Sequence, residues 1–327
     1  MNNRSVRRRS LLLAALSLTI AAAIQPARAE YPDRPVRIVL PLGAGGVGDI
    51  TARIVADKLG EKLGQRFIIE NQPGVAGISA MRSVISQPAD GYTLLLNTGG
   101  IAASMPMFNK FPVDVLGDLQ PVSSIGFFDC LFVTNAQSEY KTLSEFIKAA
   151  KANPGKLNIG TISAGGAQNL TANYLKQAAG LDVVIVPFKT TPETIIALMR
   201  NDVQMVVDFY AALSGNIADG KLRPVSWAGS QPSPAIPSLQ TADAQGVNNF
   251  DAISWNAIYV KTGTPPAIVT ALNKAIGEVL ADPALKKKLL DLGVDAKAST
   301  PAEIDKRMRD DIQKWAKVID GAGIPKQ

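Results

Sequence analysis

The sequence contains no histidine and only one cysteine, Cys130, in 327 residues. Without histidine, neither a Ser-His-Asp nor a Cys-His catalytic arrangement can form, and no imidazole is present to bind a metal. A single cysteine excludes an intrachain disulfide and a thiolate metal site. An enzyme with this composition would have to rely on carboxylates, lysine, tyrosine or a bound cofactor. Composition alone leaves such an enzyme open, but we expect no catalytic residue, no metal site and no resident cofactor.

Residues 1–29 have the three parts of an export signal. A basic start with four arginines is followed by an apolar run at 11–24 and by the small-residue site Ala27-Arg28-Ala29. The apolar run is shorter than the roughly 20 residues of a membrane-spanning helix. We expect cleavage near Ala29 and export to the periplasm. The segment Arg8-Arg9-Ser10-Leu11-Leu12 also resembles a twin-arginine signal, so the Sec and twin-arginine routes both stay open.

Most of the excess positive charge lies in this export signal. The chain has 34 basic and 28 acidic residues, and residues 1–29 hold five arginines and no acid. The remaining 298 residues therefore carry 29 basic and 28 acidic side chains, a net charge of +1. This balance gives no indication of a nucleic-acid partner. A length near 300 residues favours two domains over one.

Short apolar runs alternate with segments of helical periodicity along the mature chain. Strands are predicted at 36–40, 67–69, 92–96, 125–128, 131–134, 157–160, 183–186, 203–207, 222–227 and 252–260. Helices are predicted at 49–63, 78–86, from Thr142 onward, and at 266–280, 283–292 and 301–322. Gly64 is placed to end the first helix, and Thr142 with Glu145 has capping-box spacing. The alternation predicts an α/β protein with mostly parallel sheets flanked by helices, and Trp227 and Trp255 as core residues.

A glycine-rich loop, residues 41–49, joins the first predicted strand to the first predicted helix. Glycine lets the backbone approach a ligand closely, and the free N–H groups at a helix start favour an anion. Ligands of open α/β sheets bind beyond the carboxyl ends of strands, where this loop lies. A simple strand–helix turn capped by Asp49 is the alternative interpretation.

The same loop also matches a dinucleotide-binding pattern. Gly43-Ala-Gly45-Gly-Val-Gly48 fits G-x-G-x-x-G after a strand, and Glu70 stands where a ribose-binding acid is expected. An exported nucleotide-dependent oxidoreductase is therefore the alternative function. Asp49 directly after the third glycine, and Pro41 before the first, count against it.

A second loop, Ser163-Ala-Gly-Gly-Ala-Gln-Asn169, again places glycines and a hydroxyl at a predicted helix start. Two opposed helix N-termini can hold the two ends of a dicarboxylate without an arginine. Thr190 and Thr191 add hydroxyls at a third helix start, and Asp208 follows a strand. Ordinary helix capping is the alternative role for each of these residues.

Taken together, many short segments resemble the tripartite tricarboxylate transporter substrate-binding family, the Bug receptors. The resemblance covers about residues 30–325, and the segments that carry it are Tyr31-Pro-Asp-Arg-Pro-Val-Arg-Ile-Val-Leu-Pro41, Gly45-Gly-Val-Gly-Asp49, Ala52-Arg53, Leu63-Gly-Gln65, Glu70-Asn-Gln-Pro-Gly74, Ala89-Asp-Gly-Tyr-Thr-Leu94, Ala150-Lys-Ala-Asn-Pro-Gly-Lys-Leu157, Val186-Pro-Phe-Lys189, Gly220-Lys-Leu-Arg223, Gly263-Thr-Pro265 and Ser299-Thr-Pro301. Asn169 and Asn173 stand where the family usually has a histidine and an acid. The resemblance therefore names no specific acid.

The resemblance implies a two-domain, type II periplasmic-binding (Venus-flytrap) fold and a receptor without enzymatic activity. Domain 1 would comprise residues 30–129 and 251–327, and domain 2 residues 130–250. The receptor would be a monomer that closes on a small carboxylate, a dicarboxylate or an aromatic acid, and delivers it to a membrane permease. Signalling needs the same closing motion, so transport and signalling both stay open. The predicted ligand-binding residues are Leu42, Gly43, Gly45, Gly46, Asp49, Thr98, Ser163, Ala164, Gly165, Gly166, Asn169, Thr190, Thr191 and Asp208.

Overall fold

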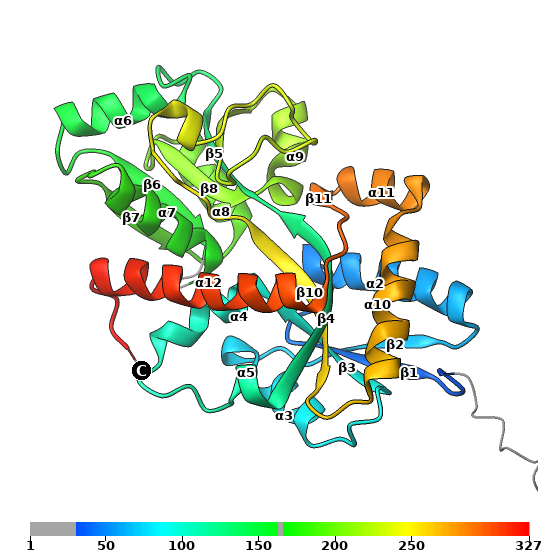
Figure 1. Cartoon of the computed structure of the whole chain (residues 1–327). Coiled ribbons are helices and arrows are strands. Elements are labelled where there is room, and N and C mark those ends of the chain that lie inside the picture. The colour runs from blue at the N-terminus through cyan, green and yellow to red at the C-terminus, as the bar shows by residue number, and fades with distance from the viewer. Residues whose placement is uncertain (1–30, 163–165, 327) are drawn as a thin grey trace, which may run out of the picture. The chain divides into compact units, whose positions relative to one another are not determined.

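The computed structural model describes residues 31–162 and 166–326. The chain divides into two units, Met1–Asp33 and Arg34–Gln327. Of the first unit only residues 31–33 are described. The strands of the second unit form two separate sheets, one of six strands and one of five (Figure 1). We call the part built on the six-stranded sheet lobe 1 and the part built on the five-stranded sheet lobe 2.

Lobe 1 is built on a sheet with the strand order β11-β4-β10-β3-β1-β2. Its strands are β1 (Val36–Leu40), β2 (Phe67–Asn71), β3 (Thr93–Thr98), β4 (Leu119–Phe128), β10 (Ser254–Lys261) and β11 (Val294–Asp295). β1 runs parallel to β2 and β3, whereas β10 runs antiparallel to both β3 and β4. Because β1 and β3 are parallel neighbours, the loops that follow them emerge side by side at one edge of the sheet.

Helices cover both faces of the lobe 1 sheet. They are α2 (Val47–Leu63), α3 (Ile78–Ile85), α4 (Gly99–Ser104), α5 (Val115–Asp118), α10 (Pro266–Leu280), α11 (Pro283–Leu290) and α12 (Pro301–Gly321), with short 3-10 turns η1 (Val75–Gly77) and η2 (Met105–Met107). On one face Leu95 and Trp255 pack against Ile304 and Met308 of α12 in a fully buried cluster. α2 packs against α10. Burial on both faces explains the continuous apolar strands.

Lobe 2 is built on a sheet with the order β7-β6-β8-β5-β9. Its strands are β5 (Cys130–Asn135), β6 (Asn158–Ile162), β7 (Val184–Phe188), β8 (Met205–Phe209) and β9 (Leu222–Trp227), and its helices are α6 (Leu143–Ala152), α7 (Ala167–Ala178), α8 (Thr191–Met199) and α9 (Tyr210–Ala218), with the 3-10 turn η3 (Asp243–Gln245). β6 is parallel to β7 and β8, whereas β5 is antiparallel to β8 and β9. Phe132 and Leu131 of β5 belong to separate cores on opposite faces of this sheet.

Both sheets are mixed, which corrects the prediction of mostly parallel sheets. The chain leaves lobe 1 along β4, and only Asp129 separates β4 from β5 in lobe 2. After the segment 228–253 it returns along β10, which therefore runs against its neighbour β4. A strand that leaves a lobe and one that comes back must point in opposite directions. The α/β class and the two-sheet, two-lobe architecture are confirmed.

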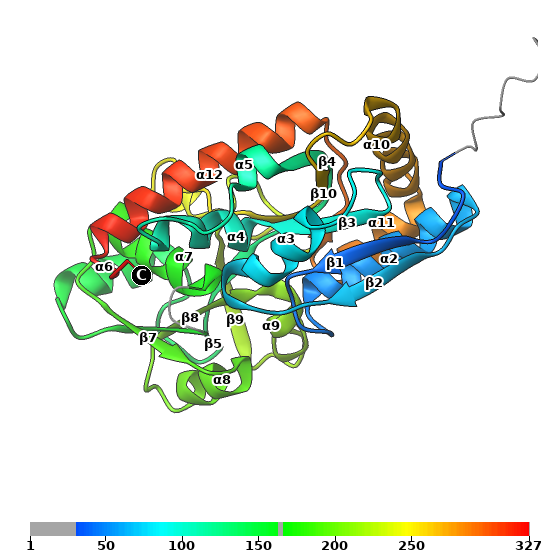
Figure 2. The same ribbon diagram turned by 90° about the horizontal axis from the view of Figure 1, so that it is seen from below.

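The last helix, α12, belongs to the cores of both lobes. Its first half contributes Ile304 and Met308 to the core of lobe 1, and its second half contributes Trp315, Val318 and Ile319 to that of lobe 2. Figures 1 and 2 show this helix running along both lobes, and it contacts α4 as well as α7. The predicted boundaries assign all of 251–327 to domain 1. These boundaries remain a prediction. The second half of α12, which they assign to domain 1, packs in the core of lobe 2.

The local signals in the sequence are confirmed where the structure describes them. Gly64 ends α2 in the left-handed conformation with φ 70°. Thr142 and Glu145 form a complete capping box on α6. Trp227 and Trp255 are 1% and 0% exposed. In the described part of the chain, no helix is both long and apolar enough to cross a membrane.

The β4 strand is longer than the sequence predicts, because its first half is held by distant polar contacts. The prediction covers 125–128, but the strand begins at Leu119. Ser123 and Ser124 are fully buried. Ser299 N donates to Ser123 Oγ at 3.1 Å, and Ser124 Oγ donates to the carbonyl of Lys297 at 2.7 Å. These partners lie more than 170 residues away in the sequence, so the local pattern of apolar residues cannot predict them.

Candidate functional site

A cavity of about 370 Å³ lies at the carboxyl ends of the lobe 1 strands, with residues of both lobes in its wall. It is lined by Leu42, Gly43, Gly46, Val47, Gly48, Thr98, Gly100, Phe128, Ala167, Phe209, Ser254 and Asn256. Most of these residues come from the loops after β1 and β3 and from the adjoining ends of β4 and β10. Lobe 2 contributes Ala167 at the start of α7 and Phe209 at the end of β8. The cavity therefore lies where strand ends of an α/β sheet bind ligands.

The loop after β1 is shaped by a buried carboxylate. Asp49 is 2% exposed, and its Oδ2 accepts hydrogen bonds from Gly45 N at 2.9 Å and Arg53 Nε at 3.1 Å. Asn71 Nδ2 donates to Asp49 Oδ1 at 2.9 Å and to the carbonyl of Leu42 at 3.0 Å. Gly45 has φ 89°, a conformation that favours glycine. The carboxylate thus folds the loop back on itself.

The pKa of Asp49 lies below its usual value although the group is buried. Burial alone would raise the pKa, but the hydrogen bonds from Arg53, Gly45 and Asn71 to the charged form outweigh it. Asp49 is therefore ionised at neutral pH and neutralised within the loop. It does not line the cavity.

Two long helices begin at the cavity with glycine at the N-cap. Gly46 precedes α2 and Gly166 precedes α7, and neither helix start has a side-chain cap. By contrast, Thr98 caps α4 by accepting from Ile101 N at 3.3 Å. Uncapped first-turn N–H groups are free to bind an acceptor, and they lie at the positive end of the helix dipole. Ala167, next to Gly166, lines the cavity, so both helix starts reach it.

In lobe 2 the buried carboxylate of Asp208 ties three elements together behind the cavity wall. Asp208 is 1% exposed. It accepts hydrogen bonds from Gln168 Nε2 at 3.0 Å, from Phe209 N at 2.8 Å and from Thr191 Oγ1. These contacts join β8 to the starts of α7 and α8. They fix the positions of Ala167 and Phe209, which face the ligand space.

The polar side chain of Asn256, on β10, has open hydrogen-bonding groups at the cavity. Asn256 is 1% exposed, and neither Nδ2 nor Oδ1 has a hydrogen-bond partner among the described residues. No lysine, arginine, aspartate or glutamate stands among the lining residues. The remaining wall includes the apolar side chains Leu42, Val47, Phe128 and Phe209. An anion in this cavity would meet backbone dipoles and an amide rather than a charged side chain.

The predicted site residues fall into three groups. Leu42, Gly43, Gly46 and Thr98 line the cavity. The second group lies in the surrounding frame and comprises Gly45, Asp49, Gly166, Asn169, Thr190, Thr191 and Asp208. Within it, Asn169 Nδ2 donates to Thr161 Oγ1 at 3.2 Å, and Thr190 caps α8. Ser163, Ala164 and Gly165 lie outside the described residues.

The sequence prediction did not include Asn256, Ser254 or Phe128 among the ligand-binding residues. A polar residue inside the apolar run of β10 was the available signal for Asn256. Which face of the sheet Asn256 lies on could not be assigned from the sequence, because that depends on the pairing of β10 with β3. In the described part of the chain, no group of three His, Cys, Asp or Glu residues is placed to hold a metal ion.

Two lobes of α/β architecture, joined by a crossover and sharing one cavity, define the class of hinged solute-binding proteins. Residues 51–324 match the family model of the tripartite tricarboxylate transporter family receptor, TctC. The chain belongs to this family.

Relatives and solved structures cover nearly the whole chain. The protein BugT of Bordetella pertussis is 30% identical over 317 residues, which span 95% of this chain and 97% of BugT. An R. palustris protein solved with adipate is 28% identical with a TM-score of 0.78, and covers 91% of this chain and 100% of its own. MatC from Rhodopseudomonas palustris, with bound malate, is 27% identical with a TM-score of 0.72, and covers 88% of this chain and 100% of its own.

The family consists of substrate-binding receptors and not of enzymes. The alternative of a nucleotide-dependent oxidoreductase is therefore not supported. Glu70, which that alternative needs for a ribose, is held instead by Arg37 Nη1 at 2.9 Å and by Gln72 Nε2 at 2.6 Å. The pKa of Glu70 lies below its usual value, first because of the Gln72 hydrogen bond, and the carboxylate is thus committed to its neighbours.

Proposed function

We propose that the chain is a periplasmic receptor that captures a small organic carboxylate in the cavity and delivers it to a tripartite tricarboxylate-type permease. The observation that carries this proposal is the pair of uncapped helix starts at Gly46 and Gly166, both at one cavity without charged side chains. Such starts bind carboxylates through backbone N–H groups. No cofactor takes part in this binding.

The known ligands of similar proteins support the chemical class. One structural relative was solved with adipate and another with malate, both small dicarboxylates. The cavity of about 370 Å³ is at the small end for ligand sites, which suits a molecule of this size. We propose binding as a monomer, with hinge closure driven by the ligand's preference for the closed state. The loaded, closed form would then be recognised by the permease subunits.

The substitution Gly46→Val tests the proposal at the first helix start. A Cβ at Gly46 meets no atom within 4 Å, and φ is −80°, so the fold can accept a side chain there. The added group would project into the ligand space and keep an anion from the α2 amides. We expect the affinity for a bound acid to fall about tenfold or more, roughly 1.4 kcal/mol. Stability should change by no more than about 1 kcal/mol.

The measurement is a thermal-shift screen of residues 30–327 with C3 to C9 aliphatic and aromatic acids. A bound acid adds RT ln(1 + [L]/Kd) to the free energy of unfolding and so raises the melting temperature. Gly277→Val in α10 is the matched control. A Cβ there also meets no atom within 4 Å, and Gly277 is not among the residues that line the cavity. A screen without any stabilising acid, or Gly46→Val binding as tightly as the control, would overturn the proposal.

A further inference from the structure

Asn256 is a buried amide without a partner in the protein. It is 1% exposed, yet both Nδ2 and Oδ1 lack a hydrogen-bond partner among the described residues. Buried polar side chains in folded proteins are almost always paired, because an unpaired donor or acceptor loses its bonds to water and gains none. Asn256 also lines the cavity. A ligand in the cavity could therefore form the hydrogen bonds that Nδ2 and Oδ1 of Asn256 lack within the protein.

The backbone around Asn256 keeps other protein groups away from it. On β10 it faces Thr98 of β3 and Gly126 of β4, and the pairing with β4 shifts register directly after it. Above it lies Gly48 in the first turn of α2, where a Cβ would stand 3.4 Å from Nδ2 and 3.6 Å from Oδ1. Gly48 and Gly126 supply no side chain to pair with the amide, and the missing Cβ of Gly48 leaves room beside it.

Few other side chains in the lining can form hydrogen bonds with a ligand. They are the hydroxyls of Ser254 and Thr98, and Thr98 Oγ1 already accepts from Ile101 N. The lining of the cavity also includes Leu42, Val47, Phe128 and Phe209, which cannot form hydrogen bonds through their side chains. A ligand hydroxyl placed against these side chains would lose its bonds to water without replacement. The walls therefore favour a hydrocarbon body.

We propose that Asn256 binds the ligand directly and that the site selects a carboxylic acid with a hydrocarbon body and a second oxygen-bearing group. The first carboxylate lies at the helix starts, and the second group lies at Asn256. There Nδ2 donates to a ligand oxygen, and Oδ1 accepts from a hydroxyl where one is present. This rests on the proposed function and adds to it the residue and the ligand class. A polyhydroxylated acid of the same length and charge is rejected by the walls.

The substitution Asn256→Leu separates a ligand role from a structural one. Leucine has the same number and branching of side-chain heavy atoms and removes both unpaired groups, so the melting temperature of the ligand-free protein stays the same or rises. The affinity for adipate falls about 10- to 100-fold, as expected for a lost hydrogen bond to a charged group. Asn256→Asp keeps the size but replaces the donor with a negative charge, and its loss of affinity is at least as large.

The control is Tyr259→Phe on the same strand. Tyr259 packs on the opposite face of the sheet, in the cluster with Ile304 and Met308 of α12. Removing its hydroxyl group should therefore leave the adipate affinity unchanged. Calorimetric titration with adipate and with galactarate, which has the same length and charge but four hydroxyl groups, tests the ligand class. We expect adipate to bind at least tenfold more tightly.

The outcomes distinguish this inference from the function on which it rests. If no acid binds the wild type, the proposed function fails. If adipate or another acid binds but Asn256→Leu keeps its affinity, the function stands and the role of Asn256 is overturned. A ligand-free Asn256→Leu protein that melts several degrees lower assigns the amide a structural role instead. Galactarate binding as tightly as adipate overturns the ligand class.

Discussion

At the scale of single residues, Asp129 is a carboxylate buried where the chain passes from lobe 1 to lobe 2. It is 7% exposed, and its Oδ1 has no hydrogen-bond partner among the described residues. A Cβ on Gly229 would lie 2.5 Å from its Oδ2, so glycine leaves the carboxyl its space. The pKa of Asp129 is raised to about 7, first of all by burial. The negative charges of Asp251 and Asp295 contribute to this rise, and Arg307 opposes it.

We predict that the free energy of unfolding decreases as pH rises from about 4 to about 7. The folded protein keeps the Asp129 proton up to about pH 7, whereas the unfolded chain loses it near 3.8. The folded state binds more protons in this window, so raising the pH favours unfolding. The decrease is at most about 4 kcal/mol, at about 1.4 kcal/mol per pKa unit. Urea unfolding at pH 5 and pH 8 measures the part of this decrease between pH 5 and pH 7, at most about 3 kcal/mol.

Asp129→Asn is the matched variant for this pH dependence. It keeps the size of the side chain and removes the titration, so its stability should differ little between pH 5 and pH 8. Equal pH dependence in the variant and the wild type would show that another group causes the effect.

The sequence predicts residue positions better than it predicts residue roles. Loop residues after strands can be recognised locally, and Leu42, Gly43 and Gly46 were found in this way, whereas Thr98 came from the family resemblance. Whether a carboxylate is free to meet a ligand depends on partners from elsewhere in the fold. Asp49 accepts a hydrogen bond from Asn71 of β2, and Asp208 accepts one from Gln168 of α7. Neither contact can be predicted from the sequence.

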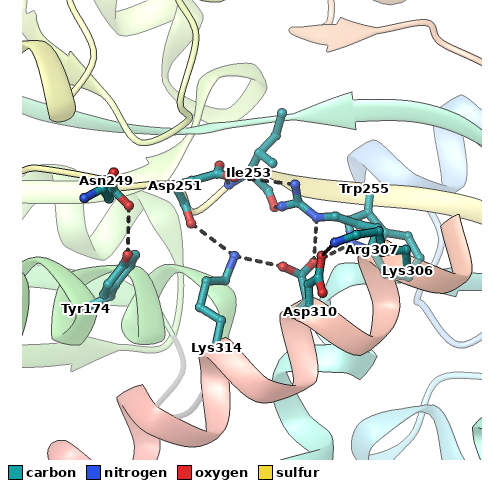
Figure 3. Close-up of polar contacts among 10 residues, drawn as sticks. Tyr174, Asn249, Asp251, Ile253, Trp255, Lys306, Arg307, Asp310 and Lys314 are labelled. Carbon is teal, nitrogen blue, oxygen red and sulfur yellow. Dashed lines mark hydrogen bonds and ion pairs between the residues drawn. The ribbon is translucent and has the colours of Figure 1, made fainter. Parts of the chain in front are cut away.

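At the scale of elements, the contact between α12 and the returning segment 249–255 holds the two lobes at the crossover. Figure 3 shows Arg307 and Lys314 of α12 reaching this segment. Arg307 Nη2 donates to the carbonyl of Ile253 at 2.9 Å, and Lys314 Nζ to that of Asp251 at 3.0 Å. Asp311 accepts from Arg307 Nε at 2.9 Å, from Trp255 Nε1 at 2.8 Å and from Lys314 Nζ at 2.8 Å.

Asp311→Ala should destabilise the protein by about 3 kcal/mol. Asp311 is 3% exposed, and its removal leaves the buried indole N–H of Trp255 without its acceptor and takes a buried carboxylate partner from Arg307 and Lys314. The neighbouring Asp310 pairs with Lys306 on the surface of the same helix, with its side chain 56% exposed. Asp310→Ala should therefore cost less than about 1 kcal/mol. Urea unfolding of both variants at one pH gives the comparison, and similar losses would contradict this account of α12.

Elements with strong local signals were predicted correctly, and those held by distant contacts were not. Helices such as α6, with its capping box, and α10 follow from periodicity and end signals. The short helix α4 and the two-residue strand β11 carry too few residues to show a period. β11 exists because it pairs with the end of β4, which is more than 160 residues away in the sequence.

At the scale of the whole molecule, the two lobes and their cavity follow from one crossing of the chain. β4 leads directly into β5, and β10 returns beside β4, so both sheets meet the cavity at strand ends. The sequence indicated α/β architecture and two lobes from alternation and length. It could not indicate the antiparallel pairing, because the direction of a strand is set by where the preceding segment ends and not by its own residues.

A crystal structure of residues 30–327 with an acid that stabilises it in the thermal screen would show directly how the ligand is held. We predict one carboxylate about 2.7–3.1 Å from backbone N–H groups at the start of α2 or α7, and the other end of the acid at Asn256. No lysine or arginine side chain should contact the ligand. An acid bound outside this cavity, or held in it by a charged side chain, would contradict the account.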